Sequence, residues 1–151
     1  MNYKIRNAVQ TDEKKICELF LEMLKTIYGT ENVEGYKEGD LNRFWNGGED
    51  RIFVAEDNKV IAFISVEVHR EAKNYIYLDD FSVTENYRNK GIGSQLLHTA
   101  EAFAAEQNIP TLILHVEKIN CSAMRFYERS GFSIYKDDGN RYMLKKDILS
   151  E

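Results

Sequence analysis

Apolar residues recur with two periods in the first part of the chain, one typical of strands and one typical of helices. Residues 3–9 read as a first strand. Thr11 is the predicted N-cap of the helix that follows, and Asp12 and Glu13 suit its first turn, where the helix dipole favours acidic side chains. The apolar stripe of this helix consists of Ile16, Leu19, Phe20, Met23, Leu24 and Ile27.

A polar segment and a hairpin come next. Residues 29–48 are polar and turn-rich, with a short helix predicted around residues 40–45. Residues 51–56 and 59–69 are rich in β-branched and aromatic side chains and predict two strands, joined by a turn at Asp57-Asn58.

The middle of the chain alternates strands with a helix. Residues 74–83 predict a third long strand, and residues 91–107 predict a second amphipathic helix that ends before Pro110. Residues 111–116 are nearly all apolar, as expected of a strand that is covered on both faces.

The last elements are short. Asn120 is the predicted N-cap of a helix that Gly131 closes, and residues 132–135 and 141–145 predict a final hairpin. The order β-α-α-β-β-β-α-β-α-β-β predicts a mixed sheet with helices on both sides, in one domain that spans residues 1–151.

Length and composition narrow the class of protein. A chain of 151 residues with 43% hydrophobic and 30% charged residues is typical of one soluble globular domain. The net charge of −5 argues against nucleic-acid binding and is compatible with a cationic substrate. No apolar run approaches the ~20 residues of a membrane span and no basic-then-apolar leader opens the chain, so we expect a cytoplasmic protein without membrane contact. Cys17 and Cys121 lie far apart without metal-ligand spacing, so we expect reduced thiols and no metal.

The strongest chemical signal is a strand that enters a glycine-containing turn and then a helix. Residues 77–83 are strand-like, residues 84–87 form a polar turn, and Arg88-Asn89-Lys90-Gly91-Ile92-Gly93 leads directly into the helix. The first N–H groups of a helix lack internal partners, and the helix dipole favours an anion beside them. An anion site and an ordinary strand-to-helix connection both fit this segment.

The element order and two motifs resemble the GNAT superfamily of N-acetyltransferases. The order matches over essentially the whole chain, and the motifs lie within about residues 77–132. Residues 88–93 satisfy the family's pyrophosphate signature, Arg/Gln-x-x-Gly-x-Gly/Ala. Asn120, with Tyr127 seven residues later, fits its second signature. The resemblance implies an α/β (α+β) fold with a mixed, mostly antiparallel sheet of about seven strands and helices on both faces.

The resemblance also implies acetyl-CoA as co-substrate. Its pyrophosphate would lie on the N–H groups around Gly91, and its pantetheine arm would bond the backbone near Val83, in the cleft beside strand 111–116. Asn120 would hold the arm through its side-chain amide, and a plain N-cap role is the alternative. The implied cofactor-binding residues are Phe81, Val83, Arg88, Asn89, Lys90, Gly91, Ile92, Gly93, Ser94, Asn120 and Tyr127.

Tyr127 is the side chain that the resemblance implies for catalysis. A thiol has an unperturbed pKa near ~8.5 and leaves a thioester readily, and a nearby phenol can protonate it. The alternative is that Tyr127 packs with Phe126 and Met124 on the short helix.

Deprotonation of the amine is the harder step, because an alkylammonium with a pKa near ~10.4 is mostly charged at neutral pH. Asp79 and Asp80 stand in a strand, where aspartate is disfavoured, and polyamine-type members of the family carry a similar pair. Successive strand residues face opposite ways, so one faces the cleft and the other faces the opposite layer or a bulge. Either one is then the catalytic base, and a buried structural carboxylate is the alternative. Glu67, His69 and His115 are weaker candidates.

Acceptor recognition in the family comes from the first helix, the following loop and the hairpins. Acidic and aromatic residues there suit a cationic amine, although a solvated polar loop is the alternative.

We predict acetyl transfer to a small basic amine such as a polyamine, a diamine or an aminoglycoside. A protein N-terminus or lysine is the second candidate acceptor, and a non-catalytic acyl-CoA sensor is the third hypothesis. The resemblance also implies a homodimer. The acceptor candidates are Tyr28, Glu31, Glu34, Tyr36, Glu38, Asp40, Phe44 and Trp45.

Overall fold

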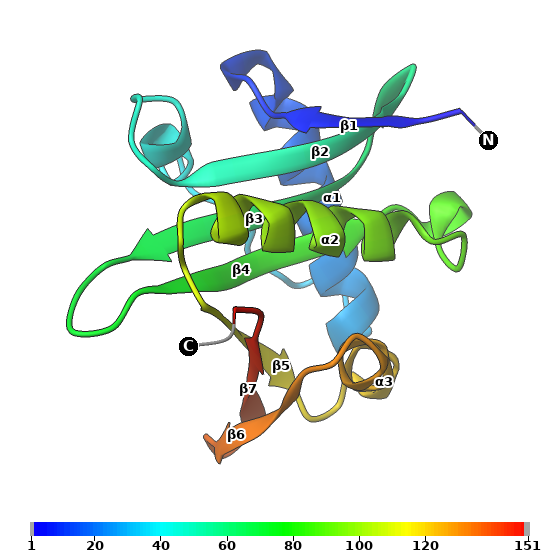
Figure 1. Ribbon diagram of the computed structural model, residues 1–151. Coiled ribbons are helices and arrows are strands. Elements are labelled where there is room, and N and C mark those ends of the chain that lie inside the picture. The colour runs from blue at the N-terminus through cyan, green and yellow to red at the C-terminus, as the bar shows by residue number, and fades with distance from the viewer. Residues whose placement is uncertain (1, 150–151) are drawn as a thin grey trace.

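A seven-stranded mixed sheet runs through the computed structural model, which describes residues 2–149 (Figure 1). Its strand order is β1-β2-β3-β4-β5-β7-β6, and all neighbouring pairs are antiparallel except β4 and β5. The predicted mixed, mostly antiparallel sheet is therefore confirmed. The strands are β1 (Lys4–Asn7), β2 (Arg51–Asp57), β3 (Lys59–His69), β4 (Tyr75–Val83), β5 (Thr111–Glu117), β6 (Ser133–Asp137) and β7 (Arg141–Asp147).

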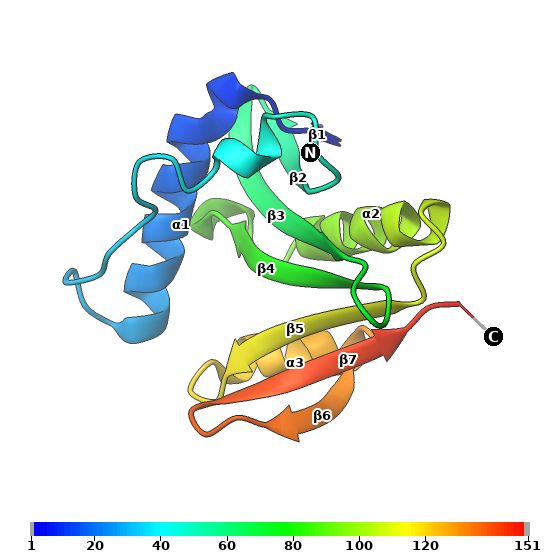
Figure 2. The same ribbon diagram turned by 90° about the vertical axis from the view of Figure 1, so that its left-hand side faces the viewer.

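Helices cover both faces of this sheet. Helix α1 (Glu13–Tyr28) packs on one face of β3 and β4, while α2 (Ile92–Glu106) packs on the other face, against β2 to β5 (Figure 2). Helix α3 (Cys121–Arg129) packs on the same core as α2 through Phe126 and Tyr127. Short 3-10 turns lie at η1 (Gln10–Asp12), η2 (Asn42–Phe44) and η3 (Glu85–Tyr87). In the described part of the chain, no helix is both long and apolar enough to cross a membrane.

The start of α1 differs from the expectation. Thr11 lies in the 3-10 turn η1, and Asp12 occupies the N-cap position. The Asp12 carboxylate accepts the N–H of Val9 at 2.8 Å and pairs with Arg6 of β1 at 2.8 Å. The ion pair to a neighbouring strand fixes the helix start at Asp12, so the prediction of Thr11 as N-cap is wrong.

Strands β4 and β5 separate towards the end of β4, and this separation creates the cleft described below. Their parallel pairing joins only Ile76–Leu78 to Leu112–Leu114, although β4 continues to Val83. Directly after Leu78 the register against β3 shifts, so that Asp79 and Asp80 together face the single residue Ser65. This β-bulge bends β4, as an extra residue in one strand does.

Candidate active site

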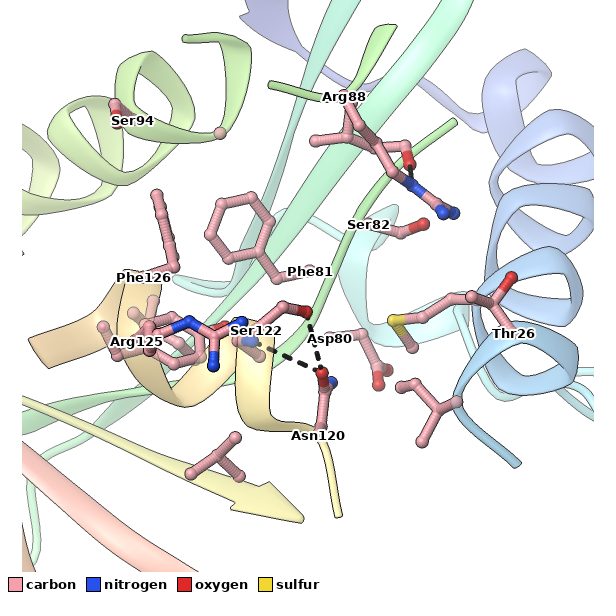
Figure 3. A pocket seen from close by; sticks show the side chains of 18 of the residues that line it. Thr26, Asp80, Phe81, Ser82, Arg88, Ser94, Asn120, Ser122, Arg125 and Phe126 are labelled. Atoms are coloured by element: carbon pink, nitrogen blue, oxygen red, sulfur yellow. Dashed lines mark hydrogen bonds between the residues drawn. The ribbon is translucent and has the colours of Figure 1, made fainter. Parts of the chain in front are cut away.

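A cleft of about 590 Å³ lies where β4 and β5 have separated. The end of β4, the N-terminus of α2, helix α3 and the last turns of α1 line it, and Figure 3 shows their side chains around a common space. From the sheet and its loops come residues 78–83, 87–89, 91 and 115–117.

The backbone at the end of β4 faces this cleft. Thr84 donates its N–H to the carbonyl of Ile61 on β3 at 2.9 Å. Hydrogen-bonded positions alternate along an antiparallel pair, so the N–H and C=O groups of Phe81 and Val83 point away from β3, towards the edge that β5 has left. The carbonyl of Val83 accepts the Arg88 Nε–H at 2.8 Å (Figure 3). The remaining groups are placed to bond an extended ligand.

The N-terminus of α2 is open in the same cleft. Gly91 has a φ of 85°, no side chain caps the helix, and its first turn contains no acidic residue. A Cβ at Gly91 would meet no atom within 4 Å, so an anion can approach the free N–H groups of residues 92–94. The side chain of Ile92 is buried in the core, and only its backbone serves this site.

The basic residues of the motif are placed differently from one another. Arg88 lines the cleft, and its guanidinium lies 3.2 Å from Glu22 of α1, which partly neutralises its charge. Lys90, one of the implied cofactor-binding residues, is exposed and is absent from the cleft wall, so its side chain finds no support in the geometry for that role.

Asn120 and Tyr127 of α3 both line the cleft. Asn120 caps the helix, because its Oδ1 accepts the N–H of Ala123 at 3.3 Å, while its amide N–H groups are left for a ligand (Figure 3). The ring of Tyr127 packs against Phe81 and Phe132, with centroid distances of 6.3 and 5.7 Å. Burial, followed by the charge of Asp80, raises the pKa of Tyr127 above its usual value, so the phenol is protonated at neutral pH.

The bulge in β4 places Asp79 and Asp80 on the same face of the sheet. Ile76 and Leu78 before it, and Phe81 and Val83 after it, belong to the core beside α2. Both carboxylates instead contact the segment between α1 and β2, on the opposite face. Since the bulge cancels the usual alternation, the two acids are neighbours at one site and not members of opposite layers.

The two carboxylates have different surroundings. Burial, and then the charge of Asp79, raises the pKa of Asp80 to about 6, and a hydrogen bond from the Tyr36 hydroxyl opposes this increase. Burial and the charge of Glu67 raise the pKa of Asp79, while Arg43 at 3.5 Å opposes the increase. Both side chains line the cleft, and Asp80 titrates near neutral pH.

The weaker candidates for a base are occupied by other partners. Glu67 binds Arg43 at 2.8 Å and His69 at 3.0 Å. His115 lies on the cleft wall, but Tyr77 and Asp138 occupy its two ring nitrogens at 2.6 and 3.1 Å.

The eight acceptor candidates lie outside the cleft wall. Phe44 and Trp45 pack on the core beneath α1, and Tyr36 turns inward to Asp80. The acids of this group and Tyr28 are exposed. The prediction of an acidic and aromatic acceptor surface therefore finds support only at Tyr36.

Several side chains at the site were missed by sequence reasoning. Arg43 holds Asp79 and stacks on Phe44 at 4.5 Å, and Glu22 holds Arg88. Arg43 lies in a segment without hydrophobic period, where no pattern marks a functional side chain. Glu22 lies on the polar face of a regular helix, whose charges usually face solvent.

Comparisons with known proteins agree with this geometry. The model of the acetyltransferase (GNAT) family matches residues 17–132. Streptothricin acetyltransferase A of Bacillus subtilis is 35% identical over 149 residues, which cover 89% of this chain and 86% of that protein. Spermidine N(1)-acetyltransferase of Thermoplasma acidophilum is 26% identical, over 99% of this chain and 100% of that protein. The crystal structure of PaiA N-acetyltransferase from Thermoplasma acidophilum, a complex with coenzyme A, superimposes with a TM-score of 0.81 at 21% identity, covering 97% of this chain and 99% of that one.

Proposed function

Because this chain belongs to the acetyltransferase (GNAT) family, we propose that it transfers the acetyl group of acetyl-CoA directly to the primary amine of a small basic molecule. One observation carries the proposal. The uncapped N-terminus of α2, the phenol of Tyr127 and a carboxylate with a pKa near 6 line one cleft. An anion site, a proton donor and a proton acceptor are what thioester aminolysis requires.

The cleft fits the parts of acetyl-CoA. The pyrophosphate would bind the open N–H groups around Gly91, where helix dipole and free donors act together. The amides of the pantetheine arm would pair with the outward backbone groups of Phe81 and Val83, and with the amide of Asn120. This arrangement would direct the thioester towards Asp80 and Tyr127.

The reaction would use one proton acceptor and one donor. As the amine nitrogen bonds to the acetyl carbon, its proton passes to the acidic pair, directly or through water. As the carbon–sulfur bond breaks, the sulfur takes a proton from Tyr127, and the phenolate then regains a proton from solvent. Releasing the free amine from an ammonium at neutral pH costs about 4–5 kcal/mol. A nearby carboxylate that accepts this proton therefore assists the reaction.

The acceptor class follows from charge. Asp79, Asp80 and Glu67 lie together, and Arg43 is the cation that contacts two of them. An ammonium group is the ligand that such a carboxylate cluster attracts. Two relatives are named for acetylation of streptothricin and of spermidine, which supports a small basic amine as substrate.

The first experiment tests the acetyl-CoA site. Saturating acetyl-CoA should raise the melting temperature, with about 2.7 kcal/mol of stabilisation at a hundredfold excess over Kd. Gly91→Glu should abolish this increase, since it places a carboxylate in the anion site. Gly47→Glu is the matched control, because both glycines have positive φ (85° and 82°) and free space around a Cβ. An unchanged melting temperature of the folded wild type would overturn the proposal.

The second experiment tests the acceptor. Release of free coenzyme A is followed with streptothricin, spermidine, a diamine, an aminoglycoside and peptides with free N-termini. Turnover of a small basic amine supports the proposed acceptor class. Turnover of peptides alone would replace it with protein acetylation, and binding of acetyl-CoA without any turnover would indicate a sensor.

A further inference from the structure

Tyr36 connects the segment before β2 to the acidic pair. Its ring stacks on Phe20 of α1, with 4.0 Å between centroids and 17° between planes. Its hydroxyl donates a hydrogen bond to Oδ2 of Asp80, which is 44 positions further along the chain. The stacked ring restricts the direction of the hydroxyl, so the phenol is a fixed donor.

Asp79 and Asp80 are held in different ways. The Asp79 side chain is 39% exposed and pairs with the permanent charge of Arg43. The backbone N–H of Asp80 donates to Oγ of Ser65 at 2.9 Å, and its carboxylate meets the neutral phenol of Tyr36. An arginine keeps a carboxylate ionised and bound in an ion pair. A phenol orients a carboxylate by a hydrogen bond and leaves it able to gain and lose a proton.

We propose that Tyr36 is a positioning residue for acetyl transfer: its hydroxyl holds Oδ2 of Asp80, so that Asp80 and not Asp79 accepts the proton of the amine. The inference rests on the proposed function and assigns the base within it. One proton of the substrate ammonium moves to the free carboxylate oxygen of Asp80, the free amine then attacks the acetyl carbon, and Tyr36 keeps its own proton throughout.

The charges around Asp80 set the expected pH dependence. Asp79 and Glu67 disfavour its ionised form, while Arg43 and Tyr36 favour it. Tyr127 lines the same cleft as a protonated phenol. Removal of the Tyr36 hydroxyl takes away one stabilising contact to the carboxylate, so the pKa of Asp80 should increase from about 6.

Tyr36→Phe tests the proposal, because the variant keeps the ring on Phe20. The rising limb of kcat/KM against pH should move up by about one to two pH units, since a hydrogen bond to a charged group contributes about 1.5–3 kcal/mol. The KM for acetyl-CoA should stay the same, and kcat should recover at high pH. Tyr135→Phe, at an exposed tyrosine of β6, is the control and should leave the profile unchanged.

Two variants of the acidic pair complete the test. Asp80→Asn should abolish the rising limb of the pH profile of kcat/KM, together with most of the activity. Asp79→Asn should retain the rising limb and move it to lower pH, since the charge of Asp79 raises the pKa of Asp80.

Three results would overturn the assignment. In the first, Tyr36→Phe lowers kcat equally at every pH, which is a purely structural effect. In the second, Asp79→Asn is inactive and Asp80→Asn is active. In both of these the proposed function stands. In the third, the wild type binds acetyl-CoA but acetylates no amine, and then the proposed function fails together with the assignment.

Discussion

Tyr127 shows how one side chain combines packing with chemistry. Its ring contributes to the aromatic cluster with Phe81, Phe126 and Phe132, and the residue also lines the cleft. Tyr127→Phe keeps the ring, so stability and acetyl-CoA affinity should change little. The loss of the proton donor should lower kcat about 10²-fold, since the thiolate still leaves unaided. Steady-state kinetics beside thermal melts measure both quantities.

If Tyr127 only packs in the core, the opposite result is expected for its catalytic activity. Tyr127→Phe with full kcat would show that the residue only fills the core, and a Tyr127→Ala variant would then lose stability alone. Tyr135→Phe, on the exposed strand β6, controls for removal of a phenol far from the cleft.

Asn120 combines two roles that different substitutions separate. Its Oδ1 caps α3, and its amide N–H groups are left for the ligand. Asn120→Asp keeps the cap acceptor and loses the donors, so stability should persist while the Kd for acetyl-CoA increases about tenfold, the effect of one lost hydrogen bond. Asn120→Ala should lose both, with about 1 kcal/mol of stability. If Asn120→Asp and the wild type bind acetyl-CoA with equal affinity, Asn120 only caps the helix and does not bind the cofactor.

At the scale of elements, the start of α2 depends on two glycines for different reasons. Gly91 needs its φ of 85°, whereas a Cβ at Gly93 would lie 3.5 Å from Phe81 and 3.6 Å from Phe126, at ordinary contact distance. Gly93→Ala should therefore stabilise the protein by about 0.5–1 kcal/mol through the lower entropy of its unfolded chain. Gly91→Ala should destabilise it by about 1–2 kcal/mol.

Urea denaturation of the two alanine variants measures this difference. Because the substitutions are identical and lie two positions apart on one turn, the comparison isolates backbone conformation. Stabilisation by Gly91→Ala would contradict the left-handed conformation at that position.

Most features set by local patterns were predicted correctly from the sequence, with the N-cap of α1 as an exception, and those that depend on distant partners were not. The turn at Gly91 and the cap at Asn120 are each set within a few residues, so the motif was sufficient. The face of Asp79 and Asp80 depends on a bulge against Ser65, which only the register of β3 and β4 determines. Tyr36 and Asp80 are in contact although 44 positions separate them, and Tyr36 lies in a segment whose apolar residues follow neither the helical nor the strand period.

At the scale of the whole molecule, one irregularity of the sheet affects both the shape of the cleft and the charge inside it. The bulge at Asp79 and Asp80 ends the pairing of β4 with β5 and opens the cleft, and it also gathers negative charges in a partly buried layer. A buried carboxylate with an anionic neighbour favours its neutral form. The proton acceptor and the opening for its substrate therefore have a common structural cause, and stability at this point should depend on pH.

The sign of that dependence follows from the pKa of Asp80, which is about 6 in the folded protein. In the unfolded chain an aspartate titrates near ~3.9, so between about pH 4 and pH 6 the folded state binds the additional proton. Stability from this group should decrease as pH rises through that window, by on the order of 3 kcal/mol, and stay low above it.

Asp80→Asn removes the charge and keeps an acceptor for the Tyr36 hydroxyl. The variant should therefore unfold at a higher urea concentration than the wild type at pH 8, and at nearly the same concentration at pH 4. Glu38→Gln, on an exposed stretch before β2, controls for the loss of one negative charge and should show no such pH-dependent difference. An Asp80→Asn variant less stable than the wild type at pH 8 would mean that the ionised carboxylate stabilises the fold. In that case the residue with the pKa suited to catalysis would have to be sought elsewhere in the cleft.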